Sequence, residues 1–264
     1  MSDLPASLAD FGPAALAAVV VAGYLVVGEP MVGRVLHRRF EGRLRTDPAA
    51  RRSFYRRLLV LEWGLAVLAL TVWLSAPGVD AAAVGLRWPQ QWPGPLTAAV
   101  VVLVLFFVVA STRVLRSGAL LDAAEPARPG HSRPSQGRHA EPSGAATLAL
   151  LPRTAVERRL FTVVGVTAGV CEEWLYRGFF LAVVAALAGG VPTGVLVLVA
   201  GVAFGLAHAY QGRVGIVTTG VLGGVMAALY LDTGSLLLPV VLHALIDLRF
   251  LLVPARALPA GRTA

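Results

Sequence analysis

Six ionisable residues lie within otherwise apolar sequence in the second half of this chain. An ionisable side chain inside a membrane-length apolar segment is costly to insert, so such residues mark functional sites by default. Only two of the five histidines lie in such segments, and both belong to this set. In chain order, the six candidate site residues are Glu172, Glu173, Arg177, His208, His243 and Asp247.

Their spacing assigns different roles to the two adjacent glutamates. Glu173 and Arg177 are four positions apart, so on a helix they share a face and can form an ion pair. Glu172 points about 100° away from Glu173, which leaves it free to act as a general base. Asp247 lies four positions after His243, where its carboxylate can orient the imidazole ring and fix its tautomer.

One glutamate and two histidines on three separate helices permit two kinds of hydrolytic chemistry. They can hold a divalent metal with an open position for water, as catalytic zinc sites do. Alternatively, the glutamate and one histidine activate water directly while the second histidine stabilises an oxyanion. The chain has no HExxH and no GxSxG pattern, which argues against an ordinary zinc-protease helix and a serine nucleophile. Its single cysteine, Cys171, excludes a disulfide framework and reads as a buried hydrophobe.

The composition predicts a helical membrane protein. Hydrophobic residues make up 56 % of the 264 positions, charged residues only 14 %, and the mean hydropathy is +0.72. Soluble domains carry about 25 % charged residues. We therefore expect an all-α polytopic fold with seven transmembrane helices, or eight if the fourth region splits in two. The predicted spans are 13–27, 58–74, 96–110, 161–188, 193–210, 214–231 and 235–253.

Arginine placement predicts the orientation in the membrane. Nine arginines fall within 31–57 and eight within 112–159, so these loops should be cytoplasmic and the N-terminus outside. The chain has no lysine and no asparagine, as expected from a GC-rich bacterial genome, which suggests a bacterial plasma membrane. The net charge of +8 is thus explained by topology and by contacts with anionic lipid, and nucleic acid is not an expected partner.

Three parts follow from these patterns. Residues 1–111 form a three-helix membrane part, 112–155 a polar cytoplasmic loop that is disordered in its middle (125–144), and 156–264 the catalytic membrane domain. Three ionisable residues near span ends are interpreted as interfacial: Glu29, Glu62 and Arg249. Small-residue pairs four apart predict close helix packing: Gly165 with Gly169, Gly201 with Gly205, and Gly220 with Gly224.

Three short motifs give the C-terminal part a family resemblance. The segment Glu172–Arg177 matches the pattern EExxxR, Phe204–His208 matches FxxxH, and His243–Asp247 matches HxxxN except for its last residue. In this order, on separate predicted helices, they resemble the CPBP family of intramembrane proteases, also called the CAAX-protease or Abi family. The resemblance covers about residues 156–253.

The resemblance implies a role for each residue. Glu172 would activate water, with His208 helping to hold that water or a metal. His243 with Asp247 would support the oxyanion, and Glu173 with Arg177 would shape the site. If a divalent metal such as zinc is used, its ligands would be Glu172, His208 and His243, but water activation without a metal is equally compatible.

The expected function is that of an intramembrane endopeptidase. It would hydrolyse peptide bonds of membrane-associated peptides or protein tails, with membrane lipid as its surroundings. The first alternative is a non-catalytic family member acting in bacteriocin-type self-immunity or as a membrane scaffold. A proton-coupled transporter using Glu172 and His208 as a relay is a third class, but the internal repeats typical of transporters are not visible. Asp247 replaces the usual asparagine, and an ionised aspartate cannot donate a hydrogen bond to an oxyanion.

Overall fold

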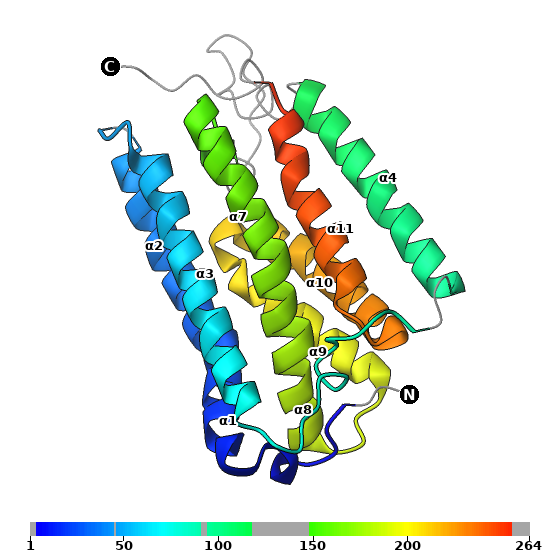
Figure 1. Cartoon of the computed structure of the whole chain (residues 1–264). Helices are drawn as coiled ribbons and strands as arrows, with labels where there is room; N and C mark the ends of the chain where they lie inside the picture. Colours follow the sequence, from blue (N-terminus) through cyan, green and yellow to red (C-terminus); the bar gives the residue numbers. More distant parts are fainter. Residues whose placement is uncertain (1–3, 45, 91–93, 118–147, 255–264) are drawn as a thin grey trace, which may run out of the picture.

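The structure, a computed structural model, describes residues 4–44, 46–90, 94–117 and 148–254. Within these residues every regular element is a helix, and the helices form one bundle (Figure 1). The protein is therefore an all-α polytopic membrane protein, as predicted. Four helical runs are long and apolar enough to cross a membrane, and a fifth apolar helix is shorter. The four runs are Leu8–Arg43, Ala50–Leu74, Pro95–Ser117 and Ala209–Thr233, and the shorter helix is Thr193–Ala207.

The N-terminal part begins with a helical run, kinked at Gly12, that is longer than the predicted span 13–27. A π-helical turn lies in the middle of this run, next to Pro30. Because proline lacks an amide hydrogen, it interrupts the regular helical ladder. The elements are η1 (Leu8–Ala14), α1 (Ala15–Gly23), η2 (Tyr24–Gly28), α2 (Glu29–Arg43), α3 (Ala50–Leu74) and α4 (Pro95–Ser117).

The fourth predicted region, 161–188, is one uninterrupted helical run and does not split. Thr154 caps its start, reciprocally with Glu157, and Gly189 ends it with φ +50°. This run consists of α7 (Ala155–Glu173), the π-helix η3 (Trp174–Phe180) and α8 (Leu181–Ala188). It is followed by α9 (Thr193–Ala207), η4 (Ala209–Gln211), α10 (Gly212–Thr233), α11 (Leu237–Leu248) and η5 (Arg249–Leu252).

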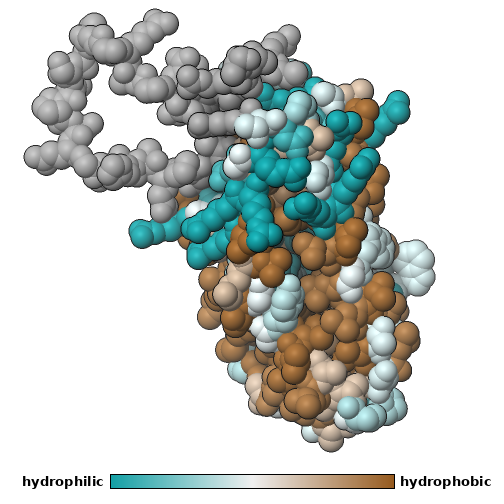
Figure 2. Space-filling view, turned by 90° about the vertical axis from the view of Figure 1, so that its left-hand side faces the viewer, coloured by the Kyte–Doolittle hydropathy of each residue, from teal (hydrophilic) through white to brown (hydrophobic). Residues whose placement is uncertain are grey.

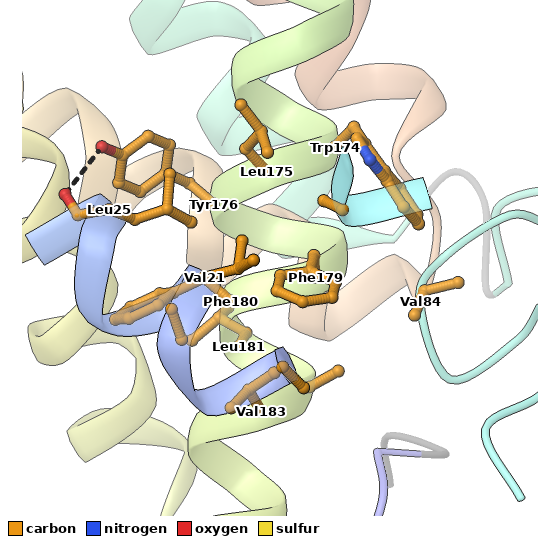
Figure 3. Packing of buried hydrophobic residues seen from close by; sticks show 14 of the residues in the cluster. Val21, Leu25, Val84, Trp174, Leu175, Tyr176, Phe179, Phe180, Leu181 and Val183 are labelled. Atoms are coloured by element: carbon orange, nitrogen blue, oxygen red, sulfur yellow. Dashed lines mark hydrogen bonds between the residues drawn. The ribbon is translucent and has the colours of Figure 1, made fainter. Parts of the chain in front are cut away.

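The π-helix η3 forms the centre of the main hydrophobic core. Tyr176 and Phe180 pack against Val21 and Leu25 of the first helical run, and the Tyr176 hydroxyl lies 3.3 Å from the Leu25 carbonyl oxygen (Figure 3). This core also includes side chains from α3 and α9. The N-terminal helices and the motif-bearing helices therefore share one core.

The predicted glycine pairs allow helices to approach closely. A Cβ on Gly201 would lie 2.8 Å from the Gly220 carbonyl oxygen, and one on Gly205 would lie 2.5 Å from that of Ile216. These residues join α9 to α10. On α7, a Cβ on Gly169 would lie 3.0 Å from the Val240 carbonyl oxygen at the start of α11. The small residues thus bring α9 close to α10 and α7 close to α11.

The polar ends of several helices lie at one end of the bundle. The turn between α2 and α3, the end of α4 and the start of α7 are found there (Figure 1). Hydrophilic side chains gather at this end, and the remainder of the visible face is mostly hydrophobic (Figure 2). Helix α4 continues to Ser117, so the polar loop does not begin at Thr112 as predicted. Most of that loop, 118–147, lies outside the described residues.

Candidate active site

A buried carboxylate on α7 links the first and third motifs. Glu173 Oε1 accepts hydrogen bonds from Arg177 Nη1 at 2.9 Å and from His243 Nδ1 at 2.7 Å. Arg177 also donates to the Gly223 carbonyl oxygen at 3.1 Å, and its guanidinium lies 4.3 Å from the centre of the Phe204 ring. The predicted Glu173–Arg177 pair therefore forms, and both side chains are fully buried.

The second glutamate faces both membrane histidines. Glu172 Oε2 lies 4.0 Å from His208 Nε2 and 3.8 Å from His243 Nε2. This oxygen is buried and has no hydrogen-bond partner. The Nδ1 atom of His208, just past the end of α9, lies 2.9 Å from the Phe204 carbonyl oxygen. One carboxylate oxygen and two imidazole nitrogens thus surround a common point.

The hydrogen bonds at the Nδ1 atoms of His208 and His243 determine whether each Nε2 atom donates or accepts a hydrogen bond. His208 Nδ1 must donate to the Phe204 carbonyl oxygen, and His243 Nδ1 donates to the Glu173 carboxylate. In a neutral ring, Nε2 is then an acceptor in both cases. A water molecule between three acceptors has only two O–H groups to offer. One of the three groups must therefore carry a proton, or a cation must share the site.

Asp247 makes no hydrogen bond to the His243 ring in the structure. Asp247 Oδ2 lies 3.9 Å from His243 Nε2, beyond hydrogen-bond distance. Glu173 holds the ring at its other nitrogen. The spacing of four residues places Asp247 beside His243 on α11, but the ring turns its Nδ1 toward α7, which packs against that helix.

The site opens into a cavity of about 570 Å³. Apolar side chains such as Leu58, Leu65 and Ile246 contribute to its wall. It extends past the motif residues to Leu150 and Phe250 near the polar end of the bundle. All six predicted site residues line it or contact residues that do: Glu172, Glu173, Arg177, His208, His243 and Asp247.

Two further carboxylates line this cavity and were missed as site residues. Glu29 accepts a hydrogen bond from the Tyr176 hydroxyl at 2.7 Å. Glu62 has a buried Oε2 with no hydrogen-bond partner. Both were predicted to be interfacial because they lie near the ends of the predicted spans. The helices extend well past those ends, which places both residues inside the bundle. Their position beside apolar stretches was the available signal.

Arg249, which was predicted to be interfacial, also lines the cavity. Its Nε donates to Ser111 Oγ on α4 at 3.1 Å. The guanidinium lies 4.1 Å from the centre of the Phe250 ring and 5.1 Å from that of Phe107. These contacts hold the side chain between α4 and η5, at the polar end of the cavity.

The donor set at Glu172 matches in part what a divalent metal requires. Two free Nε2 atoms and a carboxylate oxygen are suitable ligands, and each imidazole is supported at Nδ1, as metal-bound histidines usually are. However, within the described parts of the chain no three His, Cys, Asp or Glu side chains are placed so as to hold an ion.

Residues 156–249 match the family described as type II CAAX prenyl endopeptidase Rce1-like. The match supports the resemblance of this segment to the CPBP, or CAAX-protease, family. No curated protein and no solved structure matches the chain.

The family match separates two groups of cavity residues. All six motif residues lie inside the matched segment. Glu29 and Glu62 lie outside it, on α2 and α3. The cavity is therefore lined both by the segment that resembles a membrane-protease family and by helices that the match does not include.

Proposed function

We propose that this protein is an intramembrane endopeptidase that cleaves membrane-associated peptides or protein tails with water activated by Glu172. One observation carries the proposal. Glu172 Oε2 is buried, has no hydrogen-bond partner and lies within 4.0 Å of the Nε2 atoms of both membrane histidines. A carboxylate in this setting can take a proton from a water molecule held between it and the imidazoles.

The reaction requires two proton transfers. In the first step the water oxygen bonds to the carbonyl carbon of the substrate, and Glu172 takes the proton that the water releases. In the second step the C–N bond breaks and the leaving amine takes that proton from Glu172. His208 Nε2 accepts a hydrogen bond from the attacking water, because its Nδ1 is already committed to Phe204.

The oxyanion needs a donor, and His243 is placed to provide one. In its charged form the ring donates from Nδ1 to Glu173 and has a second N–H at Nε2. That Nε2 faces Glu172, where the tetrahedral intermediate forms. Arg177 balances the charge of Glu173 and keeps it available as a hydrogen-bond acceptor. The pair Glu173–Arg177 therefore positions His243 and does not itself contact the substrate.

The metal dependence is a separate part of the proposal. If the enzyme binds a divalent ion such as zinc, Glu172, His208 and His243 would be its ligands, and the ion would polarise water or the substrate carbonyl. The purified protein would be tested by elemental analysis and by measuring peptide cleavage before and after dialysis against a chelator. Bound zinc that is lost together with activity, and restored with it, would support this ligand set. Full activity in a metal-free preparation would reject it.

The deciding experiment compares peptide termini in host membranes. Cells with the wild-type protein would be compared with cells carrying Glu172→Gln at the same protein level, and Glu41→Gln would serve as the control. Glu41 lies on the exposed face of α2, away from the cavity. We expect specific termini to disappear with Glu172→Gln and to persist with Glu41→Gln. Unchanged termini, with Glu172→Gln still correcting a deletion phenotype, would favour the scaffold or immunity function.

A further inference from the structure

The two carboxylates from outside the family segment share the cavity with the motif residues. Tyr176, within the EExxxR motif, holds Glu29 by a hydrogen bond of 2.7 Å. Glu62 has a buried, unpartnered Oε2 and interacts electrostatically with Glu172, Asp247 and Glu29. The N-terminal helices therefore place two further carboxyl groups beside the reacting groups.

Positive groups in the cavity wall are already engaged elsewhere. Among the described residues that line the cavity, only Arg177 and Arg249 carry a permanent positive charge. Arg177 is paired with Glu173. Arg249 donates to Ser111 and to the carbonyl of Ile246, and lies over two aromatic rings. Glu29 is hydrogen-bonded to Tyr176, and Asp247 lies near His243 and interacts electrostatically with Arg249, whereas Glu62 Oε2 has no hydrogen-bond partner.

This charge distribution is the reverse of that of the whole chain. The protein has a formal net charge of +8, whereas its cavity has an excess of carboxylates. Burying a carboxylate without a partner is unfavourable, and ionisable residues at membrane depth usually serve a site. An arginine or lysine side chain in the cavity would supply the missing partner. The apolar wall beside these carboxylates suits the hydrophobic part of a membrane-bound peptide.

We propose that Glu29, Glu62 and Asp247 form a subsite for a cationic side chain of the peptide substrate, next to the bond that is cleaved. The inference rests on the proposed function in one respect, since the cation is taken to be part of the substrate. The substrate class is then an apolar, membrane-associated segment with an arginine or lysine near the cleavage position. A neutral residue of the same size would leave Glu62 Oε2 without a charged partner and would bind less well.

The test uses two probes of equal length that differ only in charge. N-dodecanoyl-arginine amide and N-dodecanoyl-citrulline amide would be titrated against the full-length protein in lipid nanodiscs. We expect wild type to bind the arginine probe about tenfold more tightly or better. The Glu62→Gln variant should lose most of this preference, and Glu29→Gln part of it. Glu62→Asp, which keeps the charge, and Glu41→Gln, outside the cavity, should retain it.

Each result has a defined meaning. Equal binding of the two probes by wild type would overturn the subsite, as would an undiminished preference in a folded Glu62→Gln variant. A divalent ion bound by wild type and lost from Glu62→Gln would assign these carboxylates to a metal instead. Glu172→Gln should lose cleavage but still prefer the arginine probe. Preference for the arginine probe without any cleavage by wild type would therefore reject the protease function and leave the cation site standing.

Discussion

Glu173 has a structural role that its position next to Glu172 conceals. Its Oε1 atom accepts hydrogen bonds from both the guanidinium of Arg177 and the imidazole of His243. Glu172 has no such partner and faces the cavity. Adjacent residues on α7 thus have different roles: Glu173 positions other side chains of the site, and Glu172 is the proposed general base.

The Arg177→Met variant should lose stability because it leaves the Glu173 charge buried without its ion-pair partner. We expect a loss of about 3–5 kcal/mol in the free energy of unfolding. Unfolding in mixed detergent micelles would measure it. The double variant Glu173→Gln/Arg177→Met removes both charges and should regain part of the loss. A single variant as stable as wild type would show that this pair does not support the fold.

Asp247→Asn should leave cleavage within about tenfold of wild type, because Asp247 does not orient the His243 ring. Glu173→Gln should reduce kcat more strongly, since the charged partner of His243 is lost. Both variants would be assayed on a substrate found by terminus mapping, with unfolding measured in parallel. A larger loss of kcat from Asp247→Asn than from Glu173→Gln would show that Asp247, and not Glu173, orients the His243 ring.

At the scale of helices, the three motifs meet because small residues let α7, α9, α10 and α11 approach closely. Arg177 reaches the Gly223 carbonyl oxygen on α10. A Cβ on Gly223 would lie 2.9 Å from the Cβ of Phe204, the first residue of the second motif. The glycines therefore determine the distances within the site as well as the packing.

Gly205→Ala should destabilise the α9–α10 pair by about 1–3 kcal/mol. Its added methyl group would lie 2.5 Å from the Ile216 carbonyl oxygen, so one backbone must move. Gly224→Ala is the matched control on the same helix pair, because its Cβ would meet Val197 at an ordinary 3.6 Å. Unfolding in detergent would compare the two variants. Equal stability of both would show that α9 and α10 do not pack as closely as described.

At the scale of the whole molecule, the arginine-rich ends of the helices give a prediction about orientation. We expect the turn between α2 and α3 to be cytoplasmic, because arginine-rich segments remain inside. Ser53 lies near this end of α3, and Ser75 follows its other end. In a Cys171→Ala background, Ser75→Cys should react with an impermeant maleimide in intact cells. Ser53→Cys should react only after permeabilisation, and the reverse pattern would invert the topology.

Local sequence patterns predicted the elements and one ion pair, but not the cavity as a whole. The predicted spans all correspond to helices, and the spacing of Glu173 and Arg177 placed them together because both lie on one helix. Glu29 and Glu62 were misplaced because their depth depends on how far α2 and α3 extend and which neighbours they meet. The Glu173–His243 bond joins residues 70 positions apart, and such a contact arises only from tertiary packing.

The hydrogen bond between Tyr176 and Glu29 also affects when the cavity can form during synthesis. The ribosome produces Glu29 almost 150 residues before Tyr176, and His243 emerges later still. The N-terminal helices are therefore made before Tyr176, the hydrogen-bond partner of Glu29, is present. Since α11 supplies the last histidine, a partly made chain lacks the complete set of reacting groups.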